Sequence, residues 1–363
     1  MSAFPSFAAD YGEARDKFLA AARIAGATTT RFEAPGKGTV GESLSTDVAW
    51  LGPDDADKVV VTISSTHGVE GFCGSGVQVD WLARRGPAAL PRGTAALFVH
   101  AINPYGFAWL RRVTAEGNDL NRNFVDHGKP YPENPGYLEI ADALIPRALS
   151  GPDFDAAEAK LKTYRDEVGD TAFLRAMSGG QYTHPDGFFF GGGGPSWSNR
   201  TTHAIIDRYL ATRRDIAVID FHTGLGPFGY GELITHYEPD SDGSRRVRAF
   251  WGESVTESKR GQTASQARDG LGHYAYNRAL SGARVTMATL EFGTYDRESG
   301  RRAFRADHWL HKYGDPLGRA AVPIRAAMRK QFYPDTDEWK EMVLFRGHQA
   351  LRQAIAGLNA APS

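Results

Sequence analysis

Cysteine is almost absent from the sequence: Cys73 is the single cysteine among 363 residues, so no internal disulfide can form. Because disulfides are frequent in secreted proteins and rare in the cytosol, we expect a cytoplasmic protein. Residues 1–27 could be mistaken for an export signal. They lack a basic leading region, however, and charged residues interrupt their apolar ones. We therefore expect an amphipathic helix of the mature protein there.

Long apolar runs and an excess of charge of one sign are also missing. No stretch approaches the ~20 apolar residues that a membrane-spanning helix needs, so a membrane location is not expected. The 42 Lys and Arg residues nearly balance the 43 Asp and Glu residues, which leaves a net charge of −1. Without a strong positive field, nucleic acid and anionic membrane surfaces are not expected partners.

Apolar strands alternate with helical patterns along much of the chain. Strands are predicted at 28–35, 44–52, 58–66, 93–106, 214–224, 231–239 and 283–295, and helices at 74–86, 199–214, 243–258 and 336–357. Such alternation is typical of an α/β sheet that helices cover on both faces.

Residues 124–200 differ from this pattern. They are rich in proline, glycine and aromatic residues and contain one helical stretch, at 155–169. We interpret them as an insertion or rim over the ends of the strands. With no repeat and no clear linker elsewhere, residues 1–363 are expected to form a single domain.

Polar residues follow several of the predicted strands. His67 and Glu70 come three residues apart directly after one strand, His222 follows a second, and Glu291 ends a third. In α/β sheets, ligands bind beyond the carboxyl ends of the strands, where these side chains should meet. Imidazole and carboxylate groups suit Zn²⁺, which takes three protein ligands in catalytic sites. Alone, a His-x-x-Glu pair is a weak signal, because most such pairs are solvated turns or helix-capping carboxylates.

The segment "INPYGFAWLRRVTAEGNDLNRNF", residues 102–124, concentrates arginine and asparagine. Arg111, Arg112, Asn121 and Arg122 stand there without lysine neighbours. A guanidinium group offers two parallel donors to a carboxylate, and asparagine adds a neutral donor. The segment could therefore bind a carboxylate, although a charged surface connection would look similar.

In their order along the chain, these elements resemble the zinc metallocarboxypeptidase family, and a bacterial branch of it most of all. The resemblance covers roughly residues 58–125 and 215–295, and "NPYGF" followed by "DLNRNF" is its most specific part. It implies a single α/β domain with a mixed, mostly parallel sheet of about eight strands and helices on both faces.

The resemblance also implies a role for each residue. One zinc ion would be bound by His67, Glu70 and His222, and Glu291 would act as general base and acid. Arg112 would stabilise the oxyanion, with Arg111 as the alternative. Asn121 and Arg122 would bind the terminal carboxylate of the substrate.

The expected reaction is hydrolysis of an amide bond next to a free carboxylate, in a peptide or an N-acyl amino acid. A small-molecule deacylase of the aspartoacylase or succinylglutamate desuccinylase kind is the alternative, and a non-catalytic zinc-containing binding module is a third. Two details stay open. The family's mobile tyrosine could be Tyr274 or Tyr276, unless both belong to the core, and residues 181–184 could be a substrate lid or a rigid turn. The sequence does not fix the oligomeric state.

Overall fold

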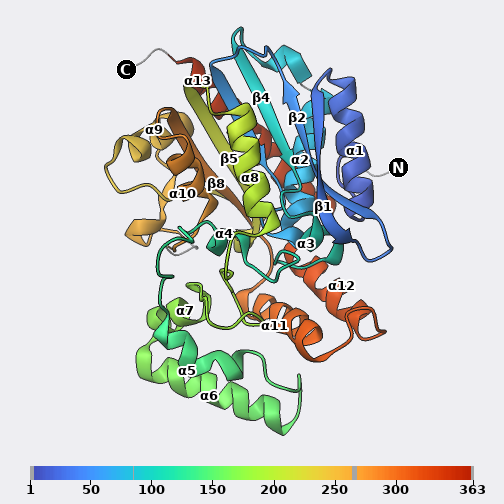
Figure 1. Cartoon of the computed structure of the whole chain (residues 1–363), viewed down its shortest axis with the longest axis vertical. Coiled ribbons are helices and arrows are strands. Elements are labelled where there is room, and N and C mark those ends of the chain that lie inside the picture. Colours follow the sequence, from blue (N-terminus) through green and yellow to red (C-terminus); the bar gives the residue numbers. More distant parts are fainter. Residues whose placement is uncertain (1–3, 85, 264–267, 361–363) are drawn as a thin grey trace.

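The structure is a computed structural model that describes residues 4–84, 86–263 and 268–360. Within these residues, eight strands form one sheet in the order β1-β2-β4-β3-β5-β8-β6-β7 (Figure 1). The pairs β3–β4, β3–β5, β5–β8 and β6–β7 are parallel, whereas β1–β2, β2–β4 and β6–β8 are antiparallel. The expected α/β fold with a mixed, mostly parallel sheet is thus confirmed.

The strands follow the predicted positions closely. They are β1 (Thr28–Lys37), β2 (Ser43–Leu51), β3 (Lys58–Ile63), β4 (Thr94–His100), β5 (Asp215–Phe228), β6 (Gly231–Thr235), β7 (Thr256–Glu257) and β8 (Arg284–Gly293). Only the short β7 was missed, because 243–258 was predicted as one helix. That helix ends at Trp251, where Gly252 adopts a φ of 89°, a conformation that stops helices and favours glycine.

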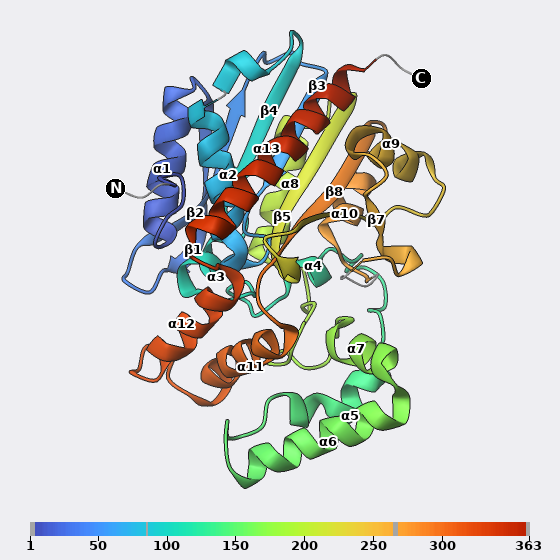
Figure 2. The same cartoon turned by 180° about the vertical axis from the view of Figure 1, so that it is seen from behind.

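Helices cover both faces of the sheet, as alternating side chains require. One face packs against α1 (Tyr11–Ile24), α2 (Gly71–Arg84), α9 (Asp242–Trp251) and α13 (Asp337–Asn359) (Figure 2). The other packs against α8 (Trp197–Tyr209) and α10 (Gly272–Ala279). In β3, Val60 belongs to the first core and Val59 and Val61 to the second. Burial on both sides explains why this strand is continuously apolar.

The remaining helices lie mostly near the carboxyl ends of the parallel strands. They are the short η1 (Gly68–Glu70), η2 (Gly86–Ala89), η3 (Ser258–Arg260), α3 (Pro104–Trp109) and α4 (Leu120–Asn123), and the longer α5 (Pro135–Leu144), α6 (Pro152–Val168), α7 (Asp170–Ser178), α11 (Arg297–Tyr313) and α12 (Ala321–Phe332). Figures 1 and 2 show α5, α6 and α7 set away from the sheet, beside α11. None of the helices in the described ranges has the length and apolarity needed to cross a bilayer.

Segment 124–200 contains three complete helices, α5, α6 and α7, where one was predicted. Phe173 of α7 and Leu161 of α6 share a hydrophobic cluster with Phe304 of α11. The predicted helix at 155–169 is α6, whereas α5, which carries a proline in its first turn, and α7 were not predicted. That this segment is an insertion stays a prediction.

An ion cluster joins α6 to α11, and we expect it to contribute to stability in a pH-dependent way. The half-buried Glu158 accepts hydrogen bonds from Arg301, at 2.7 and 3.0 Å, and from Arg305. These arginines lower the pKa of Glu158 to about 2. Glu158→Gln should lower the free energy of unfolding by about 1 kcal/mol at pH 7, after allowance for solvent screening.

The sign follows from the lowered pKa. The contribution of Glu158 is complete above its unfolded pKa of about 4.3 and is lost as the pH falls towards about 2. In denaturant titrations, the free energies of unfolding of the native protein and Glu158→Gln should differ by a constant amount between pH 7 and 5. This difference should shrink below pH 5. Glu167→Gln, on an exposed site of the same helix, is the control. A pH-independent difference would contradict this account.

Candidate metal centre

The turn after β3 is held in place by its backbone. Ser65 has a φ of 65°, and its Oγ donates to the carbonyl of Gly68 at 3.1 Å. A Cβ on Gly68 would lie 2.0 Å from the carbonyl carbon of Gly106, so only glycine fits there. The amide of Gly68 donates to the carbonyl of Arg112 at 3.1 Å. These contacts fix His67 and Glu70, on either side of Gly68, against the loop that carries Arg112.

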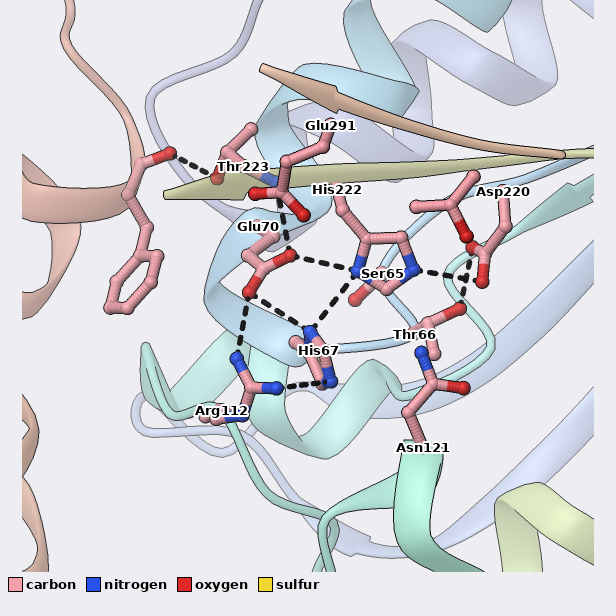
Figure 3. A network of polar contacts seen from close by, with 12 residues as sticks. Ser65, Thr66, His67, Glu70, Arg112, Asn121, Asp220, His222, Thr223 and Glu291 are labelled. Atoms are coloured by element: carbon pink, nitrogen blue, oxygen red, sulfur yellow. Dashed lines mark hydrogen bonds and ion pairs between the residues drawn. The ribbon is translucent and has the colours of Figure 1, made fainter. Parts of the chain in front are cut away.

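The other two strand-end residues are neighbours in the sheet. The parallel strands β5 and β8 pair His222 directly with Glu291. Because β3 lies on the other side of β5, its carboxyl end delivers His67 and Glu70 to the same point. The topology thus explains why side chains more than 200 residues apart meet, as Figure 3 shows.

Three donor atoms converge at this point. Glu70 Oε1 lies 2.9 Å from His67 Nδ1, and Glu70 Oε2 lies 3.1 Å from His222 Nδ1 (Figure 3). The two Nδ1 atoms are 3.1 Å apart. All three side chains are buried. In the described ranges this is the one group of three or more His, Cys, Asp or Glu residues arranged so that it could hold a metal ion.

Each histidine has a carboxylate at its other ring nitrogen. Asp220 Oδ2 lies 2.8 Å from His222 Nε2, and Asp119 Oδ1 lies 3.3 Å from His67 Nε2. Asp220 is itself held by the hydroxyl of Thr66 at 2.8 Å. If both Nε2 atoms carry the proton and donate to these carboxylates, both Nδ1 lone pairs point at the shared centre. This is the usual support of a metal-binding histidine.

The donor set fits a divalent cation. Two imidazole lone pairs 3.1 Å apart repel one another unless a proton or a metal ion lies between them. Tetrahedral ligands about 2.0–2.1 Å from a zinc ion are about 3.3 Å from each other, close to the observed separations. The buried carboxylate of Glu70, whose pKa is lowered, adds negative charge to the site. His67, Glu70 and His222 could therefore hold Zn²⁺.

The electrostatics of the site separate its two glutamates. Burial raises the pKa of Glu70, but the charges and hydrogen bonds of His67 and His222 outweigh it and leave that pKa well below its usual value. Burial, and then the charge of Glu70, raise the pKa of Glu291 to about 8. Glu291 keeps a hydrogen bond from the amide of Leu225 at 3.0 Å. One carboxylate thus stays ionised, while the other readily takes up a proton.

Of the two adjacent arginines, only Arg112 reaches the site. Its Nη1 lies 3.2 Å from Glu70 Oε1, and its Nε donates to Asp119 Oδ2 at 2.9 Å. Arg112 Nη2 also lies 2.7 Å from His67 Nε2, which is not a hydrogen bond when that nitrogen carries a proton. The Arg111 side chain instead donates to both oxygens of Asp307, at 3.0 and 3.2 Å. The geometry therefore favours Arg112 over the alternative.

Loss of Arg111 should damage stability and leave the site intact. Arg111 and Asp307 are both buried, so removing the charge of one leaves the other charge buried without its ion-pair partner. We expect Arg111→Met to lower the free energy of unfolding by about 3 kcal/mol, measured by denaturant titration, with unchanged metal content. The double variant with Asp307→Asn should recover part of that loss. Loss of metal from the folded single variant would contradict this assignment.

Asn121 and Arg122, adjacent in α4, have different partners. Asn121 faces the centre in Figure 3, and its Oδ1 accepts from the amide of Gly272 at 2.9 Å. Arg122 is fully buried, and it donates to the carbonyls of Asn121 and Ser178 at 2.9 and 2.8 Å. Their shared role in binding a carboxylate stays a prediction.

The two open details of the sequence analysis can now be described. Tyr276 is buried in the core against α8, and Tyr274 is partly buried, with the Lys259 ammonium over its ring.

Residues 181–184 form a tight turn, because the Gln181 carboxamide accepts from the amides of Thr183 and His184 at 2.9 and 2.8 Å. The ring of Phe189, next to this turn, lies 5.3 Å from the guanidinium carbons of Arg112 and Arg122. Residues 181–184 are therefore a rigid turn, and Phe189 is the neighbouring side chain that contacts the arginines of the site.

Two charged residues of the site were not singled out from the sequence. Asp119 stands in "DLNRN" and contacts both His67 and Arg112, so the motif itself contained the signal. Arg268 lies in the loop before α10, and the site charges of Arg112, Arg122, Asp119 and Glu291 all act on it. No motif marks Arg268, although the flanking sequence "RDGLG" indicates a tightly turned backbone.

Three solved structures of similar fold are distant from this chain in sequence. An aspartoacylase family protein from Mesorhizobium loti is 18% identical over 78% of this chain and 66% of its own, with a TM-score of 0.41. A succinylglutamate desuccinylase from Silicibacter is 14% identical over 79% and 67%, with a TM-score of 0.39. A metallo-carboxypeptidase from Burkholderia cenocepacia is 14% identical over 86% and 68%, with a TM-score of 0.40.

This chain thus spans about two thirds of the length of these relatives. They include the metallocarboxypeptidase class that the sequence resembles, but at such TM-scores they add nothing to the argument from the site. None of the curated proteins compared with the chain matches it. A family model does match, over residues 7–346. Because that match covers nearly the whole sequence, the chain belongs to the family described as "Protein of unknown function (DUF2817)".

Proposed function

We propose that the protein is a zinc-dependent hydrolase that cleaves an amide bond next to a free carboxylate. The observation that carries this proposal is the convergence of His67, Glu70 and His222, with the Glu291 carboxylate beside them. A purely structural metal site has four closed ligands and needs no nearby base. Three ligands with a carboxylate next to them that can act as a general base are typical of metal-assisted hydrolysis.

Each residue of the chain has a task that its position allows. When bound, a zinc ion would polarise the scissile carbonyl and lower the pKa of a water molecule. Glu291, whose pKa is raised by burial, would accept the proton of that water and deliver it to the leaving amine. When His67 Nε2 carries the proton, Arg112 Nη2 has no acceptor there, and its N–H groups would stabilise the negative charge that develops on the carbonyl oxygen.

The enclosure of the site favours small substrates. His67, Glu70, His222 and Glu291 are each at least nine-tenths buried, and the ring of Phe189 lies 5.3 Å from the guanidinium carbon of Arg112 beside them. An N-acyl amino acid deacylase is therefore a second candidate with the same chemistry. We place the enzyme in the cytoplasm, in keeping with its single cysteine.

One combined experiment tests the class and separates the candidates. The purified protein should contain about one zinc ion per chain and should lose activity on chelation and regain it with zinc. A screen of short peptides and N-acyl amino acids then assigns the substrate class. Hydrolysis of peptides indicates a carboxypeptidase, and hydrolysis of acyl amino acids alone indicates a deacylase. A zinc-loaded protein that hydrolyses neither would overturn the proposal in favour of a binding module.

A further inference from the structure

The loop that carries Arg268 is fixed against α4 by backbone contacts. The amide of Phe124 donates to the carbonyl of Gly270 at 3.1 Å, and the amide of Gly272 donates to Asn121 Oδ1 at 2.9 Å. Gly270 has a φ of 73°, and a Cβ there would lie 2.3 Å from the carbonyl oxygen of Arg122. Only glycine permits this approach. Arg268, two residues earlier, is thereby brought beside the carboxylate-binding segment predicted from the sequence.

Arg268 has no anionic partner in the described part of the chain. Its Nε is buried without a hydrogen bond, and no ion pair joins its guanidinium to a described residue. Burial, followed by the charges of Arg122 and Arg112, lowers the pKa of Arg268 well below its usual value. Arg268 is partly exposed, but a guanidinium whose Nε is shielded from water without an acceptor is unfavourable, and a bound anion would supply that acceptor.

The other arginines near the centre are already engaged. Arg111 pairs with Asp307, and Arg112 contacts Asp119 and Glu70. The Arg122 guanidinium donates to two backbone carbonyls through Nη1 and Nη2, leaves its Nε without a hydrogen bond, and is only 1% exposed. It is also closed off by Gly180, where a Cβ would lie 2.7 Å from Arg122 Cδ. Rotating Arg122 towards a substrate would break both of its hydrogen bonds.

Asn121 supplies a second donor next to Arg268. Because its Oδ1 accepts from Gly272, the orientation of the carboxamide is fixed and its Nδ2 is the remaining donor. No hydrogen bond joins Nδ2 to any residue that the structure describes. The same loop thus orients Asn121 and positions Arg268. A guanidinium and an amide held by the same loop match the two oxygens of a carboxylate.

We propose that Arg268 and Asn121, rather than Arg122 and Asn121, bind the free carboxylate of the substrate. This inference rests on the proposed function, since it names the residue that recognises the carboxylate next to the scissile amide. Arg122 is then a positioning residue, because it donates a hydrogen bond to the backbone carbonyl of Asn121. Substrates whose carboxylate is blocked as an amide should be rejected, because Arg268 would stay unpaired.

Binding measurements test this without depending on turnover. The probes are the N-acetyl derivatives of glycine, leucine, glutamate and lysine, each as the free acid and as its 1-amide. Calorimetric titration uses the zinc-loaded full chain with Glu291→Gln, so that no probe is consumed. We expect at least one acid to bind about 10–100-fold more tightly than its amide, as for a hydrogen bond to a charged group.

Variants in this background assign the preference. Arg268→Met should bind acid and amide alike, and Arg268→Lys should keep a reduced preference because it keeps the charge. Arg92→Met, at an exposed turn before β4, is the matched control and should keep the full preference. Thermal unfolding and metal content verify that each variant is folded.

Two results would overturn the inference. One is an Arg268→Met variant that still prefers the acid, which would return the role to Arg122. The other is a parent protein that binds no acid more tightly than its amide. Failure of the proposed function gives a different result: the protein with native Glu291 hydrolyses no substrate, whatever the binding preference.

Discussion

Glu291→Gln is expected to lower kcat by about 10³-fold or more on any substrate that the protein hydrolyses, with the zinc content unchanged. Glutamine keeps the volume of the side chain and can still accept from the amide of Leu225, but it cannot take up a proton. Because Glu291 lies beside the three donors and is not one of them, the metal should stay bound. Steady-state kinetics and metal analysis of the same sample measure both effects.

The same variant should make the metal-free protein more stable. Folding raises the pKa of Glu291 to about 8, from about 4.3 in the unfolded chain. The contribution of Glu291 to stability is therefore complete below pH 4.3 and is lost as the pH rises towards 8, because the unfolded chain releases this proton at a lower pH than the folded state does. Glutamine removes this dependence, so the variant should unfold at a higher temperature than the native protein at pH 8.

A matched control is available on the neighbouring strand. Glu232 of β6 pairs with Glu291 in the sheet and is also buried, but it is held by Thr256 and lies outside the donor cluster. Glu232→Gln should leave kcat within a few-fold of the native value. If Glu291→Gln retained native turnover, general-base catalysis by this residue would be refuted.

The sequence could predict the centre because the sheet brings strand ends together. His67, Glu70, His222 and Glu291 all follow β-branched or apolar runs that are readily recognised as buried strands. Parallel neighbours put their carboxyl ends at one edge, so residue type and strand position were enough. No side-chain geometry was needed for that step.

The sequence could not predict what depends on the path of the loops. Arg111 and Arg112 are adjacent, and only the contact of the Gly68 turn with their backbone decides which one faces the centre. Arg268 is brought in by Gly270 and Gly272, whose contacts with α4 join segments about 150 residues apart. Helices α5 and α7 were missed because short helices that begin at proline or glycine have weak periodic patterns.

Removal of a metal ligand should greatly weaken zinc binding. Removal of a residue that only supports a ligand should weaken zinc binding less. His222→Ala takes away one of three donors, and we expect loss of zinc from the purified protein and of all metal-dependent activity. Asp220→Asn leaves every donor in place and removes only the carboxylate that orients His222, at 2.8 Å. Its affinity for zinc should fall by roughly 10–100-fold.

The order of these effects distinguishes a metal site from a hydrogen-bonded cluster. In a cluster held only by hydrogen bonds, the short contact between Asp220 and His222 would matter most, and both variants would mainly lose stability. In a metal site, the zinc affinity falls far more in His222→Ala than in Asp220→Asn, while Asp220→Asn regains activity when zinc is added in excess. Zinc titration with a competing chelator measures both affinities. Equal zinc binding by the native protein and His222→Ala would show that these three side chains do not form a metal centre.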